Sequence, residues 1–271
     1  MTNEIYAPIA LTIAGSDSGG GAGIQADLKA FSALRVFGAS VITAITAQNT
    51  QAVTAVHDVP VDVIAAQLNA VLSDLNVRAI KIGMLSSPAI IECVADQLAD
   101  FNGPVVLDPV MVSKSGARLL QPDALDALRA KLIPLATIVT PNLPEAADIT
   151  DTNETQDVAE LAAQAQAILA MGAKAVLMKG GHATGEICTD LLYTSGEPAL
   201  ELAAPRVRTK NTHGTGCTYS ASIAAGLARE LALQDAVAAA HDYLSKAIVA
   251  ADRLEIGSGH GPVHHFHELW S

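Results

Sequence analysis

Short runs of β-branched and aliphatic residues alternate with longer alanine-rich stretches through most of the chain. The short runs are typical of buried strands, and the apolar positions of the longer stretches recur every three to four residues, as in amphipathic helices. Strands are predicted at Ile9–Ala14, Ser40–Ala47, Ala79–Met84, Val105–Asp108, Thr137–Thr140 and Ala175–Lys179. Helices are predicted at Ile24–Leu34, Val61–Asp74, Ala89–Asp100, Asp123–Ile133, Thr155–Met171, Thr218–Leu231 and Asp235–Arg253. A late hairpin is predicted from Ile187–Tyr193 and Ala199–Ala203. This alternation predicts an α/β fold with a mostly parallel central sheet and helices on both faces, in one domain over residues 1–271.

The composition limits the classes of partner. The 271 residues include 28 acidic and 16 basic ones, for a net charge of −12. Because no basic stripe is available to neutralise phosphates, we expect no nucleic-acid or anionic-membrane partner. No uncharged apolar run approaches the length of a membrane span, and the first residues lack a signal-peptide pattern, so we expect a cytosolic protein. Three cysteines without a C-x-x-C pair indicate neither a disulfide framework nor a zinc site.

Glycine, amide and charged residues gather directly after the predicted strands. In open α/β sheets, ligands bind at the carboxyl ends of the strands, so these residues predict one site along one edge of the sheet. The segments concerned are 15–23, 48–49, 83–84, 108–109, 141–145 and 179–181.

The segment Gly214-Thr215-Gly216-Cys217 stands directly before a helical pattern. Its glycines let backbone N–H groups converge, and a helix that starts there adds the positive end of its dipole, so the segment predicts an anion-binding site. A thiol near a helix N-terminus has a lowered pKa, and Cys217 is therefore a candidate thiolate base or nucleophile. The alternative is a small buried cysteine beside a glycine-capped helix.

The first glycine-rich loop, residues 15–23, follows a strand and precedes a helix. It contains no G-K-[ST] and is therefore not a Walker A loop. Its Gly21-x-Gly23-x-x-Ala26 only imitates a dinucleotide fingerprint, because Gln48 stands where a Rossmann site would carry an acid. The remaining interpretations are a ligand-binding loop or a flexible turn.

Two carboxylates and a lysine end or follow later strands. Asp108 and Glu145 are hard ligands of the kind that hold Mg²⁺ through its waters, and Lys179 beside a glycine pair suits a phosphate contact. Glu145 has the simpler alternative of a helix N-terminal charge, and Lys179 that of a surface lysine. Asn142, beside Glu145, is either part of the same site or a turn residue.

The C-terminal histidines at 260, 264, 265 and 267 lack paired carboxylates or cysteines, so packing or surface roles are favoured over a metal site. Ser113, Lys114 and Ser115 suggest a flap, although nothing in their spacing requires one.

Taken in order, these segments resemble the hydroxymethylpyrimidine/phosphomethylpyrimidine kinases of thiamine biosynthesis, within the ribokinase-like superfamily. Cys217 stands where ribokinase-like relatives usually carry Asp, which points to the pyrimidine-kinase branch. One departure is Ser18-Gly19, where many relatives have Pro-Ser. The resemblance runs nearly end to end, through residues 11–29, 40–50, 81–85, 106–111, 140–146, 177–182, 211–218 and 261–267.

The resemblance implies ATP-dependent phosphorylation of 4-amino-5-hydroxymethyl-2-methylpyrimidine and then of its monophosphate, in a homodimer that uses Mg²⁺. Gln48 would pair with the aminopyrimidine edge, and Cys217 would take the hydroxyl proton. The pocket would be completed by Gly15, Ala22, Asp27, Met84 and Val110. The phosphates would be held by Gly214, Thr215, Gly216, Thr212, Asn142 and Lys179, with Asp108 and Glu145 toward the metal.

Two alternatives stay open at this point. A pyridoxal or pyridoxine kinase would share much of the pattern, and a non-catalytic nucleotide- or pyrimidine-binding regulator would share the pocket without needing a base. An NAD-linked dehydrogenase is disfavoured by Gln48.

Overall fold

The computed structural model describes residues 7–112, 116, 119–121, 123–182 and 185–270. Eight strands form one sheet in the order β10-β9-β8-β7-β6-β5-β1-β2. Strands β2, β1, β5, β6, β7 and β8 run parallel, and the β9–β10 hairpin adds two antiparallel strands at one edge. The strands are β1 Ile9–Ala14, β2 Phe37–Ile42, β5 Val77–Ile82, β6 Val105–Leu107, β7 Ile138–Val139, β8 Ala175–Met178, β9 Ile187–Thr194 and β10 Leu200–Pro205.

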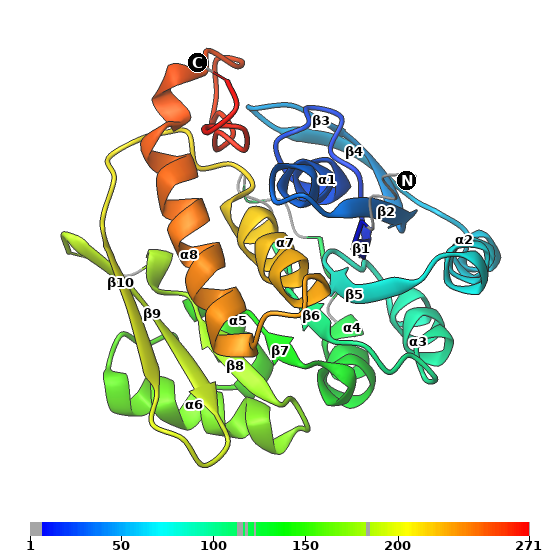
Figure 1. The fold of residues 1–271 in the computed structure, drawn as a ribbon. Helices are drawn as coiled ribbons and strands as arrows, with labels where there is room; N and C mark the ends of the chain where they lie inside the picture. The colour runs from blue at the N-terminus through cyan, green and yellow to red at the C-terminus, as the bar shows by residue number, and fades with distance from the viewer. Residues whose placement is uncertain (1–6, 113–115, 117–118, 122, 183–184, 271) are drawn as a thin grey trace, which may run out of the picture.

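Helices cover both faces of this sheet (Figure 1). On one face α1, α7 and α8 pack together, and on the other lie α2 to α6. Their bounds are α1 Gly23–Ala33, α2 Val61–Asp74, α3 Pro88–Gln97, α4 Ala124–Ala127, α5 Leu143–Thr150, α6 Val158–Ala170, α7 Thr215–Ala228 and α8 Leu233–Val249. The α/β fold with helices on both faces of a mostly parallel sheet is confirmed.

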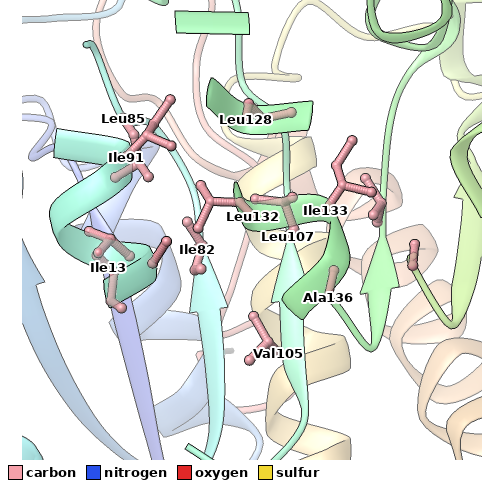
Figure 2. Close-up of a cluster of buried hydrophobic side chains, with 14 of the residues drawn as sticks. Ile13, Ile82, Leu85, Ile91, Val105, Leu107, Leu128, Leu132, Ile133 and Ala136 are labelled. Carbon is pink, nitrogen blue, oxygen red and sulfur yellow. The ribbon is translucent and has the colours of Figure 1, made fainter. Parts of the chain in front are cut away.

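The two cores follow from the period-2 alternation of buried strands. In β6, Val105 and Leu107 enter the core under α2 to α6, while Val106 enters the core under α7 and α8. Figure 2 shows the first core, where Ile82 and Leu107 meet side chains of the segment after α4. That segment is a π-helix, Leu128–Leu132, followed by a 3-10 turn, so the predicted helix Asp123–Ile133 is only partly α-helical.

The predicted strand Ser40–Ala47 is in fact two strands. The chain turns at Thr43, whose N–H donates to Ala14 O at 3.0 Å and whose hydroxyl donates to Met84 O at 2.9 Å. After this turn, β3 (Ala44–Gln48) leaves the main sheet and pairs with β4 (Val53–Asp58) in a separate two-stranded sheet. This departure carries Gln48 over the edge where the parallel strands end. None of the helices that the structure describes is long and apolar enough to cross a membrane.

Candidate functional site

The carboxyl ends of the parallel strands meet the start of α7 at one edge of the sheet. Asp108 follows β6, Lys179 follows β8, and Gly216 lies in the first turn of α7. A Cβ at Gly216 would lie 3.4 Å from Lys179 Nζ and 3.6 Å from Asp108 Oδ2. Ser220, one turn further along α7, donates to Asp108 Oδ2 at 3.2 Å. Glycine at 216 therefore leaves the helix N-terminus open toward a lysine and a carboxylate.

Gly214 caps α7 and can only be glycine. Its φ of 78° lies in the left-handed region, and a Cβ there would stand 1.8 Å from Gly21 O. The close approach brings the first glycine-rich loop against the anion-binding segment. Because α7 begins at Thr215 and not at the predicted residue 218, Cys217 lies inside its first turn.

One ammonium group lies between two buried carboxylates. Lys179 Nζ is 2.9 Å from Asp108 Oδ1 and 3.9 Å from Glu145 Oε2. Burial would raise the pKa of Asp108, but the charges of Lys179 and Lys81 hold it below its usual value. For Glu145, burial outweighs Lys179 and raises the pKa to about 7, and the charge of Asp108 adds to the increase.

These residues fit a hard divalent cation. A buried carboxylate with a raised pKa is one whose negative charge lacks full compensation, and added positive charge beside it would supply that compensation. Within the part of the chain that the structure describes, no three His, Cys, Asp or Glu side chains are grouped to hold a metal ion. Two carboxylates therefore suit Mg²⁺, which keeps most of its waters and takes phosphate oxygens, better than a cation held by protein ligands alone.

Glu145 also has the structural role that the sequence left open. Its Oε2 accepts the Asn142 N–H at 2.8 Å, and the Asn142 side chain accepts the Glu145 N–H at 2.9 Å, which is a capping box at the start of α5. The isolated bridge between Asn142 and Lys179 extends the β7–β8 alignment to the site. The cap fixes Glu145 beside Lys179.

The expected low pKa of Cys217 is wrong for this structure. Burial raises the pKa of the thiol to about 11, although the charge of Lys81 opposes the shift. The carboxylates of Asp27 and Asp108 raise it further. A thiol whose pKa is raised to about 11 is protonated at neutral pH, although Cys217 lies in the first turn of a helix.

A buried ion pair lies beneath the cysteine. Lys81 Nζ is 2.8 Å from Asp27 Oδ2, and both side chains are inaccessible to solvent. The same oxygen accepts the hydroxyl of Thr12 at 2.6 Å. The sequence expectation placed Asp27 at the border of the pyrimidine pocket; its carboxylate instead faces Lys81 inside the protein. Sequence reasoning missed Lys81, because a lysine in an apolar strand carries no signal of its partner.

The other predicted pocket residues lie at strand ends or in loops. Gly15 and Met84 are in contact, since a Cβ at Gly15 would be 2.9 Å from Met84 Sδ. Gln48 ends β3, with its amide 3.2 Å from His213 Nε2. Ala22, Val110 and Thr212 are partly exposed.

Two of the C-terminal histidines are packed inside the protein, which is one of the roles that the sequence favoured. His264 and His265 are buried, and His265 Nε2 lies 2.9 Å from the Thr218 hydroxyl on α7. The candidate flap residues 113–115 lie outside the described residues.

Known proteins of one family are similar to this chain over almost its whole length. The family model described as phosphomethylpyrimidine kinase matches residues 17–264. A hydroxymethylpyrimidine/phosphomethylpyrimidine kinase of Rhizobium meliloti is 60% identical over 97% of this chain and 98% of that protein. The Escherichia coli enzyme of the same name is 51% identical over 96% of this chain and 98% of that protein.

Solved structures of two kinds share the fold. The ADP complex of Bacillus subtilis pyridoxal kinase has a TM-score of 0.89 and 38% identity, covering 98% of this chain and 100% of that one. The phosphomethylpyrimidine kinase of Clostridium difficile has a TM-score of 0.77 and 46% identity, covering 89% and 99%.

Proposed function

Since the chain belongs to the phosphomethylpyrimidine kinase family, we propose that it uses ATP to phosphorylate 4-amino-5-hydroxymethyl-2-methylpyrimidine and then the resulting monophosphate, in thiamine biosynthesis. The transferred group would sit at the start of α7, against the N–H groups of Gly214, Thr215 and Gly216. The observation that carries the proposal is the approach of Gly216 to both Lys179 and Asp108, because it joins an anion-binding helix terminus to a cation and a metal-type ligand.

Charge compensation explains how an acidic protein would handle ATP. Lys179 would contact the phosphates locally, and Asp108 and Glu145 would hold Mg²⁺ through its waters. The metal would neutralise charge that develops on the phosphate oxygens. Asn142 and Thr212 would border the nucleotide phosphates.

Cys217 would accept the proton of the attacking hydroxyl group. With a pKa of about 11, only the fraction of Cys217 that has released its proton to solvent can act as this base, and the charge of Lys81 favours that thiolate. The second phosphorylation places a lower demand on this base, because a phosphate monoester is already largely ionised near neutral pH.

Gln48 would read the pyrimidine. An amide offers a donor and an acceptor side by side, which complements an exocyclic amine next to a ring nitrogen. Met84 and Val110 would form apolar walls, and Gly15 and Ala22 would border the ring. By resemblance we also propose a homodimer in the cytosol.

The test offers the purified protein Mg-ATP with the hydroxymethylpyrimidine, its monophosphate and pyridoxal in parallel. We expect both pyrimidines to be phosphorylated with higher kcat/KM than pyridoxal. Gln48→Ala should raise the KM for the pyrimidine about 5- to 100-fold and the KM for ATP much less, because the pocket loses one amide. Preferential phosphorylation of pyridoxal, or binding of ATP and pyrimidine without turnover, would overturn the proposal.

A further inference from the structure

A hydrogen-bond network joins the proposed pyrimidine pocket to the anion-binding segment. Its centre is His213, the residue before the glycine that caps α7, with a side chain only 11% exposed. His213 Nε2 lies 2.8 Å from Asp17 Oδ2 and 3.2 Å from the side-chain amide of Gln48. The three residues come from three segments far apart in the sequence: the first loop, β3 and the entry to α7.

Asp17 is held as a carboxylate. Its Oδ1 accepts the Gly19 N–H at 2.8 Å, and its Oδ2 accepts the N–H groups of Gly21 and Ala22 at 3.0 and 2.8 Å. Burial would raise the pKa of Asp17, but the hydrogen bonds from His213 and the backbone hold it below its usual value. An ionised carboxylate only accepts hydrogen bonds, so His213 Nε2 carries the proton in the 2.8 Å contact.

That proton decides which end of the Gln48 amide faces the imidazole. A protonated Nε2 has no lone pair with which to accept from an amino group at 3.2 Å, whereas a carbonyl oxygen at that distance is attracted to the hydrogen that Nε2 donates mainly to Asp17. The other end of the amide leads to the same orientation. The structure places Gln48 Nε2 toward the imidazole and Oε1 3.3 Å from Thr46 Oγ1, and these hydrogen bonds require the two atoms of the amide, which are alike in size, to be exchanged. The single hydrogen of Thr46 Oγ1 is already donated to Ser16 O at 2.8 Å. Thr46 is therefore left as an acceptor and takes a hydrogen from the amino group.

The imidazole is fixed in place from two sides. A Cβ at Gly21 would stand 2.4 Å from His213 Cδ2, so the loop backbone lies directly against the ring. The His213 N–H donates to Gly261 O at 3.0 Å, which ties its backbone to the C-terminal segment. A ring held in this way can impose an orientation on a neighbour.

We propose that His213, held by Asp17, is a positioning residue that sets the orientation of the Gln48 amide and so determines which substrate edge the pocket accepts. One lone pair of Oε1 and one hydrogen of Nε2 remain for a ligand. An amidine-like edge, with an amine next to a ring nitrogen, satisfies both. A ring without the amine leaves the Gln48 oxygen without that donor. This inference rests on the proposed function, because it deepens how the same pocket selects its substrate.

The experiment measures discrimination between two alcohols: 4-amino-5-hydroxymethyl-2-methylpyrimidine and the same ring without the 4-amino group. His213→Leu removes the Nε2 donor and replaces the imidazole with an apolar side chain of similar size. His213→Gln places a side-chain N–H close to the position of Nε2. We expect the ratio of the two kcat/KM values to fall about tenfold or more in His213→Leu and to be largely restored in His213→Gln. The KM for ATP should change less. Thermal melting followed by circular dichroism reports whether each variant is folded.

A second measurement needs no turnover. Long-range ¹⁵N–¹H NMR correlations identify which imidazole nitrogen of wild-type His213 carries the proton, and we expect Nε2. An unprotonated Nε2, or an unchanged discrimination ratio in folded His213→Leu, would overturn the inference. If the wild-type protein phosphorylates neither alcohol, the proposed function fails, but the NMR measurement still tests the hydrogen-bond network. If His213→Leu does not fold, the NMR measurement alone tests the inference.

Discussion

At the scale of single residues, the site is defined by charges that are unequally compensated. The fully buried pair of Lys81 and Asp27 contains one positive and one negative charge, whereas Lys179 serves both Asp108 and Glu145. The shortfall appears at Glu145, where the pKa rises to about 7. Ionisation of this residue in the folded protein is therefore costly until another cation arrives.

This imbalance predicts how stability depends on pH. The folded pKa of Glu145 is about 7, above its ordinary value of 4.5, so between these limits the folded protein keeps a proton that the unfolded chain has released. Stability should then fall as pH rises from about 5 to about 8 without Mg²⁺, by a few degrees in Tm. Glu145→Gln should remove this dependence. Added Mg²⁺ should raise the Tm at pH 8 in the wild type but not in the variant. Calorimetry with EDTA or Mg²⁺ makes the measurement, and an equal Mg²⁺ effect in both proteins would contradict a metal role for Glu145.

The thiol of Cys217 gives a second prediction at this scale. Because its pKa is raised to about 11, alkylation by iodoacetamide should be slow at pH 7 and should accelerate about tenfold per pH unit up to that region. Mass spectrometry would follow Cys217 separately from Cys93 and Cys188. An alkylation rate that has already reached its plateau near pH 7 would show that Cys217 is a thiolate at that pH.

Cys217→Ala should slow phosphorylation of the free alcohol about 10²- to 10⁴-fold and that of the monophosphate less. If Cys217→Ala slows both phosphorylations equally, the side chain shapes the anion-binding site and does not accept the proton.

At the scale of elements, the start of α7 is where the chemistry and the fold depend on the same glycines. Gly214→Ala places a Cβ in a left-handed conformation and against Gly21 O, so we expect a loss of stability of more than about 1 kcal/mol and separation of the two loops. Gly216→Ala is the matched control, because its Cβ would meet Lys179 and Asp108 at ordinary contact distances. It should keep the Tm and reduce kcat by crowding the phosphate. Melting curves and kinetics of both variants make the test; a wild-type Tm in Gly214→Ala would refute the close approach.

Sequence patterns predicted the elements whose apolar period is regular. The strand Ile9–Ala14 and the helix Val61–Asp74 have the predicted bounds. Strand β4 was missed because Val53–Asp58 is largely exposed and has no buried face to create an alternation. Helix α5 was not among the predicted helices because it is short and follows Pro141, although a helix N-terminal charge was one of the two interpretations of Glu145.

The sequence predicted the residues of the candidate site that stand at strand ends, but not those whose role depends on partners remote in the sequence. The strand ends located Asp108, Glu145, Lys179 and the start of α7, because that argument needs only the order of the elements. No local pattern could show that His213 faces Asp17, since 196 positions separate them.

At the scale of the whole molecule, the C-terminal segment packs against the turn that follows Gln48. The C-terminal segment runs past the β3–β4 turn, where the His260 N–H donates to Thr50 O at 2.8 Å and the Gly259 N–H to Thr50 Oγ1 at 3.1 Å. The same segment meets the entry to α7 through Asn211, whose Oδ1 accepts the Gly261 N–H at 3.2 Å. The turn begins directly after Gln48, so the position of Gln48 depends on a segment more than half the chain away.

This dependence is testable through Gly259, which lies on the backbone of the turn. A Cβ there would stand 2.1 Å from Thr50 O, and its nearest neighbours are all backbone atoms of Thr50 and Gln51, so no flexible side chain could move aside. Gly259→Ala should therefore separate the C-terminal segment from the turn, lower the Tm by several degrees and raise the KM for the pyrimidine about tenfold, with a smaller change for ATP. Ser258→Ala is the control, because it removes only an exposed hydrogen bond from Gln51. Its Tm and both KM values should stay close to those of the wild type. If Gly259→Ala raises the two KM values equally, the C-terminal segment supports the fold in general and does not specifically position the pyrimidine pocket.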